Sequence, residues 1–331
     1  SDNRSHFLYA LDMPRMLSRL DSDQRRQLNE ALDRKALYYL RKFVRNVADI
    51  RSDQRWAASC APEIAELYNR ALDRDDVQLA ITPMTRDPAT GRAYIPGSSI
   101  KGALRTAWVN HKLQTAPDRP RRPREFEPDL LGYRYRDEDG RNRFELRADP
   151  FRAVKVGDCL LPDNSNSIER VQIYKPDRKA GAPDPSGIHM FYDVTFSALD
   201  GEDIRATGRL IIDQRLAGRR GPDRGRWNFR NCVADAISAE QLLAACNEFY
   251  RPRLDDELKR FPHVHEHAGK LSEIAAALTE NQALIRLGRF SHRECVTVPP
   301  RRDARPKHGS TRSLVSGDLP LGWVCIELRE V

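Results

Sequence analysis

Residues 94–112, YIPGSSIKGALRTAWVNHK, are the stretch of this sequence that most restricts how the chain folds. A proline–glycine–serine turn opens the stretch. Apolar side chains then recur at the three- and four-residue spacing of a helix with one buried side. The residues on that side are Ile100, Ala103, Leu104, Ala107, Trp108 and His111. The spacing therefore predicts a turn followed by a helix that packs on a hydrophobic core.

The start of this predicted helix carries groups that suit an anion. Gly97 is suited to the positive φ of a sharp turn, and Ser98 or Ser99 is suited to the helix N-cap. Lys101 and Arg105 are four residues apart, so both side chains can face one ligand beside the backbone N–H groups of the first turn. Two interpretations stay open here: a phosphate-binding site, or an ordinary capped helix.

The stretch does not have the spacing of a nucleotide-binding P-loop. That motif places a hydroxyl residue directly after its lysine to bind Mg²⁺, whereas Gly102 follows Lys101 here. Hydrolysis of ATP or GTP is therefore not expected. Because glycine is a poor helix former, Gly102 in the first turns indicates that another group passes close to the backbone.

The net charge favours a polyanionic partner. The 331 residues include 56 Lys and Arg against 48 Asp and Glu, which gives a net charge of +8 and a pI of about 9.3. Only 10 of the 56 are lysine, and the planar guanidinium group of arginine suits phosphates and bases. A nucleic acid is one such partner, although many basic proteins bind nothing acidic.

Composition argues against several other classes of protein. The six cysteines are scattered without a C-x-x-C pair, which disfavours both a zinc ribbon and a disulfide scaffold. No apolar run is long enough to cross a bilayer, and the first residues do not have the layout of a signal peptide. We therefore expect a cytosolic (cytoplasmic) protein.

Helix and strand patterns mix without a steady βαβ rhythm, which predicts an α+β fold. Helices are predicted near residues 22–46, 63–72, 237–261 and 271–279. In the third of these, Ser238 is the expected N-cap and Pro262 follows the expected end. Three parts are expected along the chain: residues 1–114 with a helical insertion, a basic proline- and arginine-rich loop region at 115–150, and a β-rich half at 151–331 with a closing strand.

The octapeptide Ile95–Gly102, followed by Arg105 and Thr106, resembles the I-P-G-S-S-x-K-G-x-x-R signature of the RAMP proteins of CRISPR–Cas systems. Four later segments resemble one branch of that family, the fifth Csm subunits of type III-A effector complexes. They are residues 149–158 (DPFRAVKVGD), 246–250 (CNEFY), 284–289 (LIRLGR) and 320–324 (PLGWV). The strand and TPvHIGsG-like turn with which family members begin are not found, so the chain is expected to start downstream of them.

The resemblance implies an RRM-like, ferredoxin-like core with large helical and loop insertions. It further implies a non-catalytic subunit that binds the guide RNA (crRNA), caps the crRNA 3′ end of the filament of backbone subunits, and supports crRNA 3′ maturation in antiviral defence. The implied partners are crRNA, a target RNA, the neighbouring RAMP backbone subunit and the small helical subunit of the Csm complex. No cofactor, metal or catalytic residue is expected.

Two segments hold the candidate RNA-binding residues. The first comprises Gly97, Ser98, Ser99, Lys101 and Arg105. The second comprises Arg286, Gly288, Arg289 and His292. Phe290 is either a stacking aromatic or a core residue. The basic loops at residues 119–124 and 219–230 either contact RNA or a neighbouring subunit, or are solvated insertions.

An RNA-processing enzyme of the same family is the alternative, with His292 or His111 as general acid or base. Metal-independent cleavage needs two proton-transfer groups close together, and the sequence offers only isolated candidates. The histidines of HVHEH, at positions 263, 265 and 267, follow Pro262 between two predicted helices, which favours a polar loop over a metal site. A capping subunit of a type III-B complex is a further alternative, which the PLGWV ending disfavours.

Overall fold

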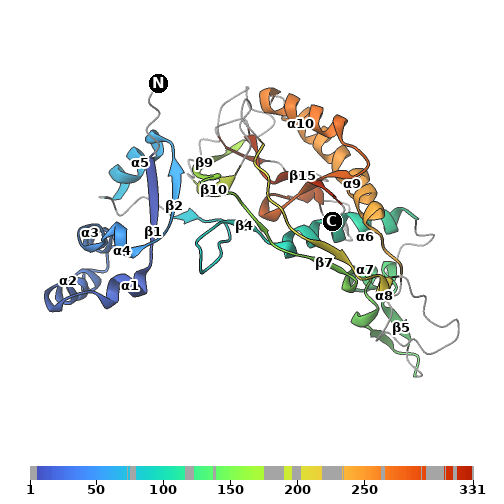
Figure 1. Ribbon diagram of the computed structural model, residues 1–331, viewed down its shortest axis with the longest axis horizontal. Helices are drawn as coiled ribbons and strands as arrows, with labels where there is room; N and C mark the ends of the chain where they lie inside the picture. The colour runs from blue at the N-terminus through green and yellow to red at the C-terminus, as the bar shows by residue number, and fades with distance from the viewer. Residues whose placement is uncertain are drawn as a thin grey trace. The chain divides into compact units, whose positions relative to one another are not determined.

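The computed structural model describes residues 6–72, 74, 80–115, 123–136, 139–174, 190–195, 203–217, 233, 235–261, 265–291, 293–295, 309, 311–315 and 319–329 (Figure 1). The chain forms two compact units, and neither is one continuous piece of sequence. Unit 1 comprises residues 1–94, 160–172 and 184–206, and unit 2 comprises residues 95–159, 173–183 and 207–331. The ranges 1–114, 115–150 and 151–331 therefore do not coincide with the two units.

Unit 1 is built on a mixed sheet with the strand order β1–β2–β9–β10–β3. Its strands are β1 (His6–Leu11), β2 (Gln54–Cys60), β3 (Ile81–Thr82), β9 (Asn166–Tyr174) and β10 (Met190–Thr195). The pairs β1–β2 and β9–β10 are antiparallel, whereas β2–β9 and β3–β10 are parallel. Such a sheet, together with the helices, confirms the α+β class.

Five helices of unit 1 lie in its first part. They are α1 (Met13–Ser18), α2 (Ser22–Asp33), α3 (Leu37–Val47), α4 (Ile50–Asp53) and α5 (Pro62–Leu72). The single helical region predicted at residues 22–46 is thus two helices, because the chain turns at Lys35 with a φ of 53°. The helix predicted at residues 63–72 is confirmed.

Unit 2 contains α6 (Gly97–Thr115), α7 (Pro123–Leu130), α8 (Gln214–Ala217), α9 (Ala239–Arg260) and α10 (His265–Ala277). Its paired strands are β5 (Arg134–Arg136) with β6 (Asn142–Phe144), β7 (Val154–Val156) with β11 (Leu210–Ile212), β12 (Gln282–Arg286) with β15 (Trp323–Glu327), and β13 (Arg312–Val315) with β14 (Leu319–Pro320). Short strands β4 (Tyr94–Ile95) and β8 (Cys159–Leu160) pair with each other. Turns of 3-10 helix cover Leu146–Ala148, Pro150–Arg152, Gly288–Ser291 and Arg293–Cys295.

The main core of unit 2 lies between α6 and α9, which run side by side in Figure 1. The Tyr250 hydroxyl on α9 donates a hydrogen bond of 3.1 Å to the carbonyl of Ala103 on α6. Ser238 caps α9 and forms a capping box with Gln241, and α9 ends at Arg260, so this predicted helix is confirmed. Among the described residues, no helix combines the length and the apolar character that spanning a membrane requires.

The expectation of a loop within residues 115–150 is wrong for residues 123–130, which form α7. Proline suits the first position of a helix because its φ is already helical and its missing N–H would have no partner there. Phe126 and Leu131 are buried, and this burial holds the segment in place. Residues 119–122 and 219–230 of the two basic loops lie outside the described residues.

Candidate nucleic-acid interface

The stretch that begins at residue 94 forms a strand, a turn at Pro96 and the long helix α6. Ile100, Ala103, Leu104, Ala107 and Trp108 of α6 are all buried in the core of unit 2, which confirms the predicted apolar side. His111 lies at the margin of that side, where its ring stacks on Trp108 with centroids 5.5 Å apart. The helix therefore fixes its own first turn against the rest of unit 2.

The sequence suggested that Gly97 is needed for a positive φ. The structure shows instead that Gly97 is needed for close packing. A Cβ atom at this position would lie 2.2 Å from the carbonyl oxygen of Val156 and 2.7 Å from the backbone of Gly157. Gly97 has no positive φ, whereas Gly91, Gly132, Gly140, Gly288 and Gly322 do. Glycine is therefore the residue that lets α6 approach β7.

The N-terminus of α6 already holds an anion that belongs to the chain. The N–H of Gly97 donates a hydrogen bond of 2.7 Å to Oδ1 of Asp158, which follows β7. A carboxylate at this position complements the positive end of the helix dipole. Ser98 and Ser99 lie inside the first turn, so neither is the expected N-cap. The helix start is consequently not an open phosphate site of the kind that the sequence suggested.

Lys101 is bound to the edge of β7. At the two ends of β7, the carbonyl of Ala153 accepts a hydrogen bond from the N–H of Asp213, and the N–H of Gly157 donates one to the carbonyl of Arg209. The backbone groups of alternate residues along the strand therefore point towards β11. The carbonyl of Val154 points the other way, and Nζ of Lys101 donates to it at 2.7 Å. Burial lowers the pKa of Lys101, and the nearby charge of Asp149 opposes this. Lys101 thus supplies a hydrogen-bond donor at the edge of β7 with which no described strand pairs.

Arg105 is held by two carboxylates of unit 2. Its Nε donates to Glu127 at 2.6 Å, and its Nη1 donates to Asp149 at 2.9 Å. Its guanidinium carbon also lies 5.2 Å from the centroid of the Phe151 ring. These partners join α6 to α7 and to the turn at residues 149–152. In this conformation, Arg105 stabilises the fold around α6.

The second candidate segment contains a buried ion network. Arg286 is only 3% exposed, and its guanidinium binds both carboxylate oxygens of Glu257 on α9. Arg312 lies between Glu257 and Glu294, 3.2 Å and 2.6 Å from their oxygens. The expectation that Arg286 contacts RNA is not compatible with this burial, because its donors face protein groups. We assign Arg286 to the core of unit 2.

Gly288 lies two residues after the end of β12, and no described atom crowds it. Gly288 has a φ of 70°, and a Cβ there would meet no described atom within 4 Å. Arg289 continues a turn of 3-10 helix, but its side chain lies outside the described part of the chain. His292 also lies outside it. Phe290 is half-buried, and its Cβ would be 3.5 Å from a Cβ on Gly322.

Two exposed cations that sequence reasoning missed lie on the ribbon of β7 and β11. Lys155 pairs with Ile211, and Arg209 lies opposite Gly157, so both side chains are on one face of this ribbon. Both residues are exposed, whereas Val154 is fully buried. The signal in the sequence was the alternation Val154-Lys155-Val156, which predicts one buried and one exposed strand face.

The first turns of α6 carry two small residues that are exposed. Ser98 and Gly102 are exposed and one turn apart. A Cβ on Gly102 would meet no described atom within 4 Å, so no described protein group accounts for the glycine at this position. A Cβ on Gly97 would lie 2.7 Å from the backbone of Gly157, so the start of α6 adjoins the β7 end of the ribbon. We call Ser98, Gly102, Lys155 and Arg209 the α6–ribbon surface.

The structure also shows where the histidines lie. Nδ1 of His111 on α6 is 2.9 Å from Oε2 of Glu248 on α9. The HVHEH segment is not only a loop, because α10 begins at His265. Within the described parts of the chain, no group of three or more His, Cys, Asp or Glu residues could hold a metal ion.

Comparison with known proteins identifies the family to which this chain belongs. Residues 80–258, more than half of the chain, match the RAMP superfamily. No curated protein matches the sequence. The fold is similar to that of Csm5 from T. onnurineus, with a TM-score of 0.58 and 16% identity over 98% of this chain and 93% of that one. It is also similar to a chain of a Csm–crRNA–target RNA ternary complex of a type III-A CRISPR–Cas system, with a TM-score of 0.63, 16% identity and the same coverage. The chain belongs to the RAMP superfamily.

Proposed function

We propose that this chain is an RNA-binding subunit of a type III CRISPR effector complex. Membership of the RAMP superfamily and the similarity of its fold to two Csm structures support this role. Within that role, we assign it to the type III-A (Csm) branch as a non-catalytic subunit that caps the crRNA 3′ end and supports 3′ maturation. Its partners are then crRNA, a target RNA and the neighbouring Csm subunits.

The observation that carries the proposal is the α6–ribbon surface. RNA backbone binding needs cations for the phosphates and room for the chain to approach. Lys155 and Arg209 supply the cations, while Ser98 and Gly102 supply an open surface and a hydroxyl group. Lys101 and Arg105 hold the shape of this surface through their protein partners. Ser99 and the backbone of Gly97 complete the turn beneath it.

A second RNA contact belongs to the segment after β12. Gly288 has a positive φ, and no described atom lies within 4 Å of the position that a Cβ would take there. Arg289 and His292 follow it in the sequence and offer a phosphate-binding and a stacking group. This contact is independent of the α6–ribbon surface, because it uses a different strand end.

The test is the affinity of the full chain for a single-stranded crRNA, measured by fluorescence anisotropy at several salt concentrations. The double variant Lys155→Gln/Arg209→Gln should bind more weakly, and its log–log salt slope should fall by about 1.4, which corresponds to two lost phosphate contacts. The matched control, Lys259→Gln/Arg329→Gln, removes two exposed cations elsewhere in unit 2. Equal behaviour of the two double variants would contradict the assigned surface.

A ribonuclease is the second candidate, because the structure brings together two proton-transfer groups. His111 and Glu248 are 2.9 Å apart, and their side chains are 39% and 38% exposed. The same pair also ties α6 to α9, which is reason enough for it in a non-catalytic protein. Incubation of the chain with a crRNA precursor distinguishes the two. Cleavage that is lost in His111→Ala and Glu248→Gln would establish the enzyme.

A further inference from the structure

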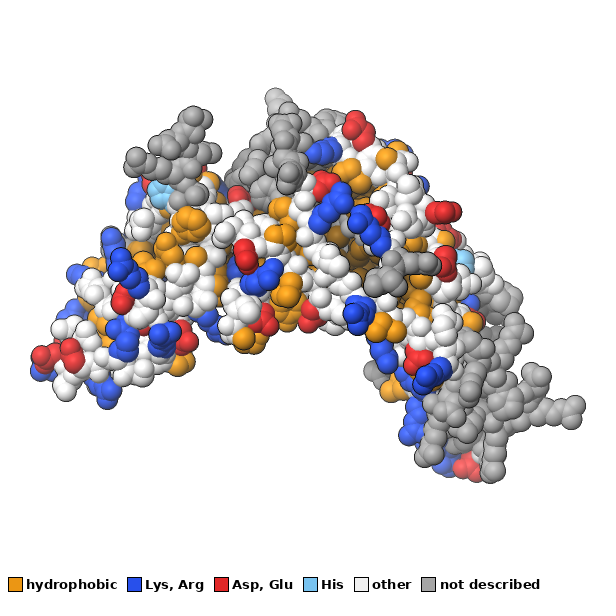
Figure 2. Space-filling view, in the orientation of Figure 1, with side chains coloured by type: hydrophobic (Ala, Val, Ile, Leu, Met, Phe, Trp, Pro, Cys, Tyr) orange, Lys and Arg blue, Asp and Glu red, His pale blue; other side chains and the backbone are white. Residues whose placement is uncertain are grey.

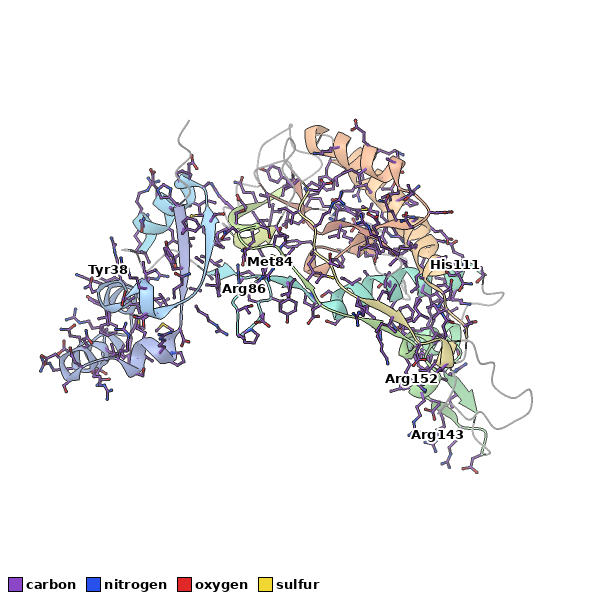
Figure 3. The ribbon with its side chains drawn as sticks, in the orientation of Figure 1. Tyr38, Met84, Arg86, His111, Arg143 and Arg152 are labelled. Carbon is purple, nitrogen blue, oxygen red and sulfur yellow. The ribbon has the colours of Figure 1, made fainter. Side chains whose placement is uncertain are left out.

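Unit 1 contains a cavity of about 290 Å³ on the outer side of α3. Its lining residues are Tyr38, Arg41, Lys42, Arg45, Asn46 and Leu72. Five of the six follow the spacing i, i+3, i+4, i+7 and i+8, so they share one side of α3. Leu72, at the end of α5, also lines the cavity. Tyr38 is labelled in Figure 3.

The other side of α3 fixes this orientation. Phe43 is buried with Leu20 and Ala31 in a small core between α2 and α3, and Leu40 and Val44 pack against that core. An amphipathic helix held in this way must present its remaining residues outward. The cavity-facing side is therefore set by the packing of α2 on α3, and it does not depend on unit 2.

Charge makes the cavity suited to an anion. Three of its six lining residues are Lys or Arg, and none is acidic. Arg41 donates to the carbonyl of Arg74 at 2.9 Å, which holds its guanidinium beside the cavity. Lys42 and Arg45 are exposed, and no described carboxylate lies within ion-pair distance of either. Figure 2 shows Lys and Arg side chains (blue) over the surface of the helices of unit 1.

The ring of Tyr38 narrows the class of anion. Nζ of Lys42 lies 5.9 Å from the centroid of this ring, so an aromatic face and a cation adjoin in one cavity. A nucleotide uses both, the base against the aromatic ring and the phosphate at the cations. An acidic peptide would use only the cations. A volume of about 290 Å³ is at the small end of ligand cavities, which fits one nucleotide.

We infer that this side of α3 binds a nucleotide of single-stranded RNA, through Tyr38, Lys42, Arg45 and Asn46. The inference rests on the proposed function and deepens it, because it adds an RNA contact on α3, which precedes residues 80–258 that match the RAMP superfamily. It assigns unit 1 an RNA contact of its own. It also predicts that RNA contacts α3 when the α6–ribbon surface has been altered.

The experiment uses the full chain and a thiouridine-containing oligouridine about 12 nucleotides long, within the range bound by single-strand-binding modules. Photocrosslinking followed by mass spectrometry should identify a peptide that contains Tyr38. The variant Lys42→Gln/Arg45→Gln should lose this crosslink and raise the Kd by about ten-fold, as the loss of two phosphate contacts implies. Its charge-matched control is Arg26→Gln/Arg51→Gln, which alters exposed residues of unit 1 outside the cavity.

Further variants separate the outcomes. Tyr38→Phe should retain the binding and Tyr38→Ala should weaken it, with circular dichroism confirming that both are folded. Lys155→Gln/Arg209→Gln should keep the crosslink at α3, so failure of the proposed function is distinguishable from failure of this inference. Absence of any crosslink in α3 would overturn the inference. Displacement of the oligouridine from α3 by polyglutamate at a lower concentration than by unlabelled oligouridine of the same charge would also overturn it, by identifying an acidic polypeptide as the ligand.

Discussion

Nζ of Lys101 donates a hydrogen bond of 2.7 Å to the backbone carbonyl of Val154, at the edge of β7 that faces away from β11. A basic residue of the signature can either bind RNA or stabilise the fold, and this contact distinguishes the two roles. A lysine that binds RNA must face solvent, whereas Lys101 is partly buried and its ammonium group is bound to the chain's own backbone. Lys155, on the same strand, is an exposed lysine.

The first prediction compares these two lysines. Lys101→Met removes the donor and leaves the Val154 carbonyl without its partner, so the free energy of unfolding should fall by about 1–3 kcal/mol. Lys155→Met removes an exposed cation and should change that free energy by about 0.5 kcal/mol or less. Urea unfolding followed by circular dichroism measures both. A Lys101→Met protein of normal stability that has lost its RNA affinity would reverse the two assignments.

The second prediction compares two glycines of the same helix. Gly97→Ala places a Cβ 2.2 Å from the Val156 carbonyl oxygen, so it should destabilise the protein by about 3 kcal/mol. Gly102→Ala meets nothing in the described structure and should stabilise α6 by about 0.5–1 kcal/mol. Thermal unfolding of the two variants measures this difference in sign. Equal destabilisation by both would contradict the packing of α6 on β7.

The third prediction concerns the buried pair of Arg286 and Glu257. Arg286→Met leaves the Glu257 carboxylate buried with only Arg312 beside it, and the expected loss of stability is about 3–5 kcal/mol. Arg329→Met, at an exposed position, is the control and should change stability by about 0.5 kcal/mol or less. Chemical denaturation measures both. A stable Arg286→Met variant with weaker RNA binding would restore Arg286 to the RNA interface.

The fourth prediction is a dependence on pH. Burial alone would raise the pKa of Glu294, but the hydrogen bond from Arg312 and its charge lower it from 4.5 to about 2. Because the pKa of Glu294 is lower in the folded state, its ionised carboxylate stabilises the fold at pH values above its pKa in the unfolded chain. This stabilisation disappears as the pH falls from about 4.5 towards 2. Relative to Glu294→Gln, the wild-type chain should lose about 2 kcal/mol of stability between about pH 6 and pH 3.

Denaturation curves of the two proteins at both pH values give this difference directly, because other acidic groups contribute equally to each. A constant difference in stability across the range would show that Glu294 is not held ionised by Arg312. Glu63→Gln, on the exposed side of α5, checks that loss of any carboxyl group does not produce the same effect.

Local features of the fold could be predicted from the sequence because they depend on near neighbours. Ser238 is followed three residues later by Gln241, and this spacing alone defines the cap of α9. The buried side of α6 follows from the recurrence of Ile100, Leu104 and Trp108. The two units could not be predicted, since unit 1 combines residues that are far apart in the sequence.

The candidate site was harder to predict, because its side chains have distant partners. Lys101 binds a carbonyl 53 positions away, and Arg286 binds a carboxylate 29 positions away. A basic residue in a glycine-rich motif looks the same in sequence whether its partner is RNA or protein. Lys155 could have been found, because its neighbours Val154 and Val156 mark the opposite face of the strand.

The most direct test of the central claim is to crosslink the tagged full chain in cells, purify it under denaturing conditions and sequence the attached RNA. We expect guide RNAs that carry spacer sequences, with crosslinks concentrated in their 3′ portion. Recovery of RNA without spacer sequences, or of no RNA at all, would contradict the assignment of this chain to a crRNA-containing complex.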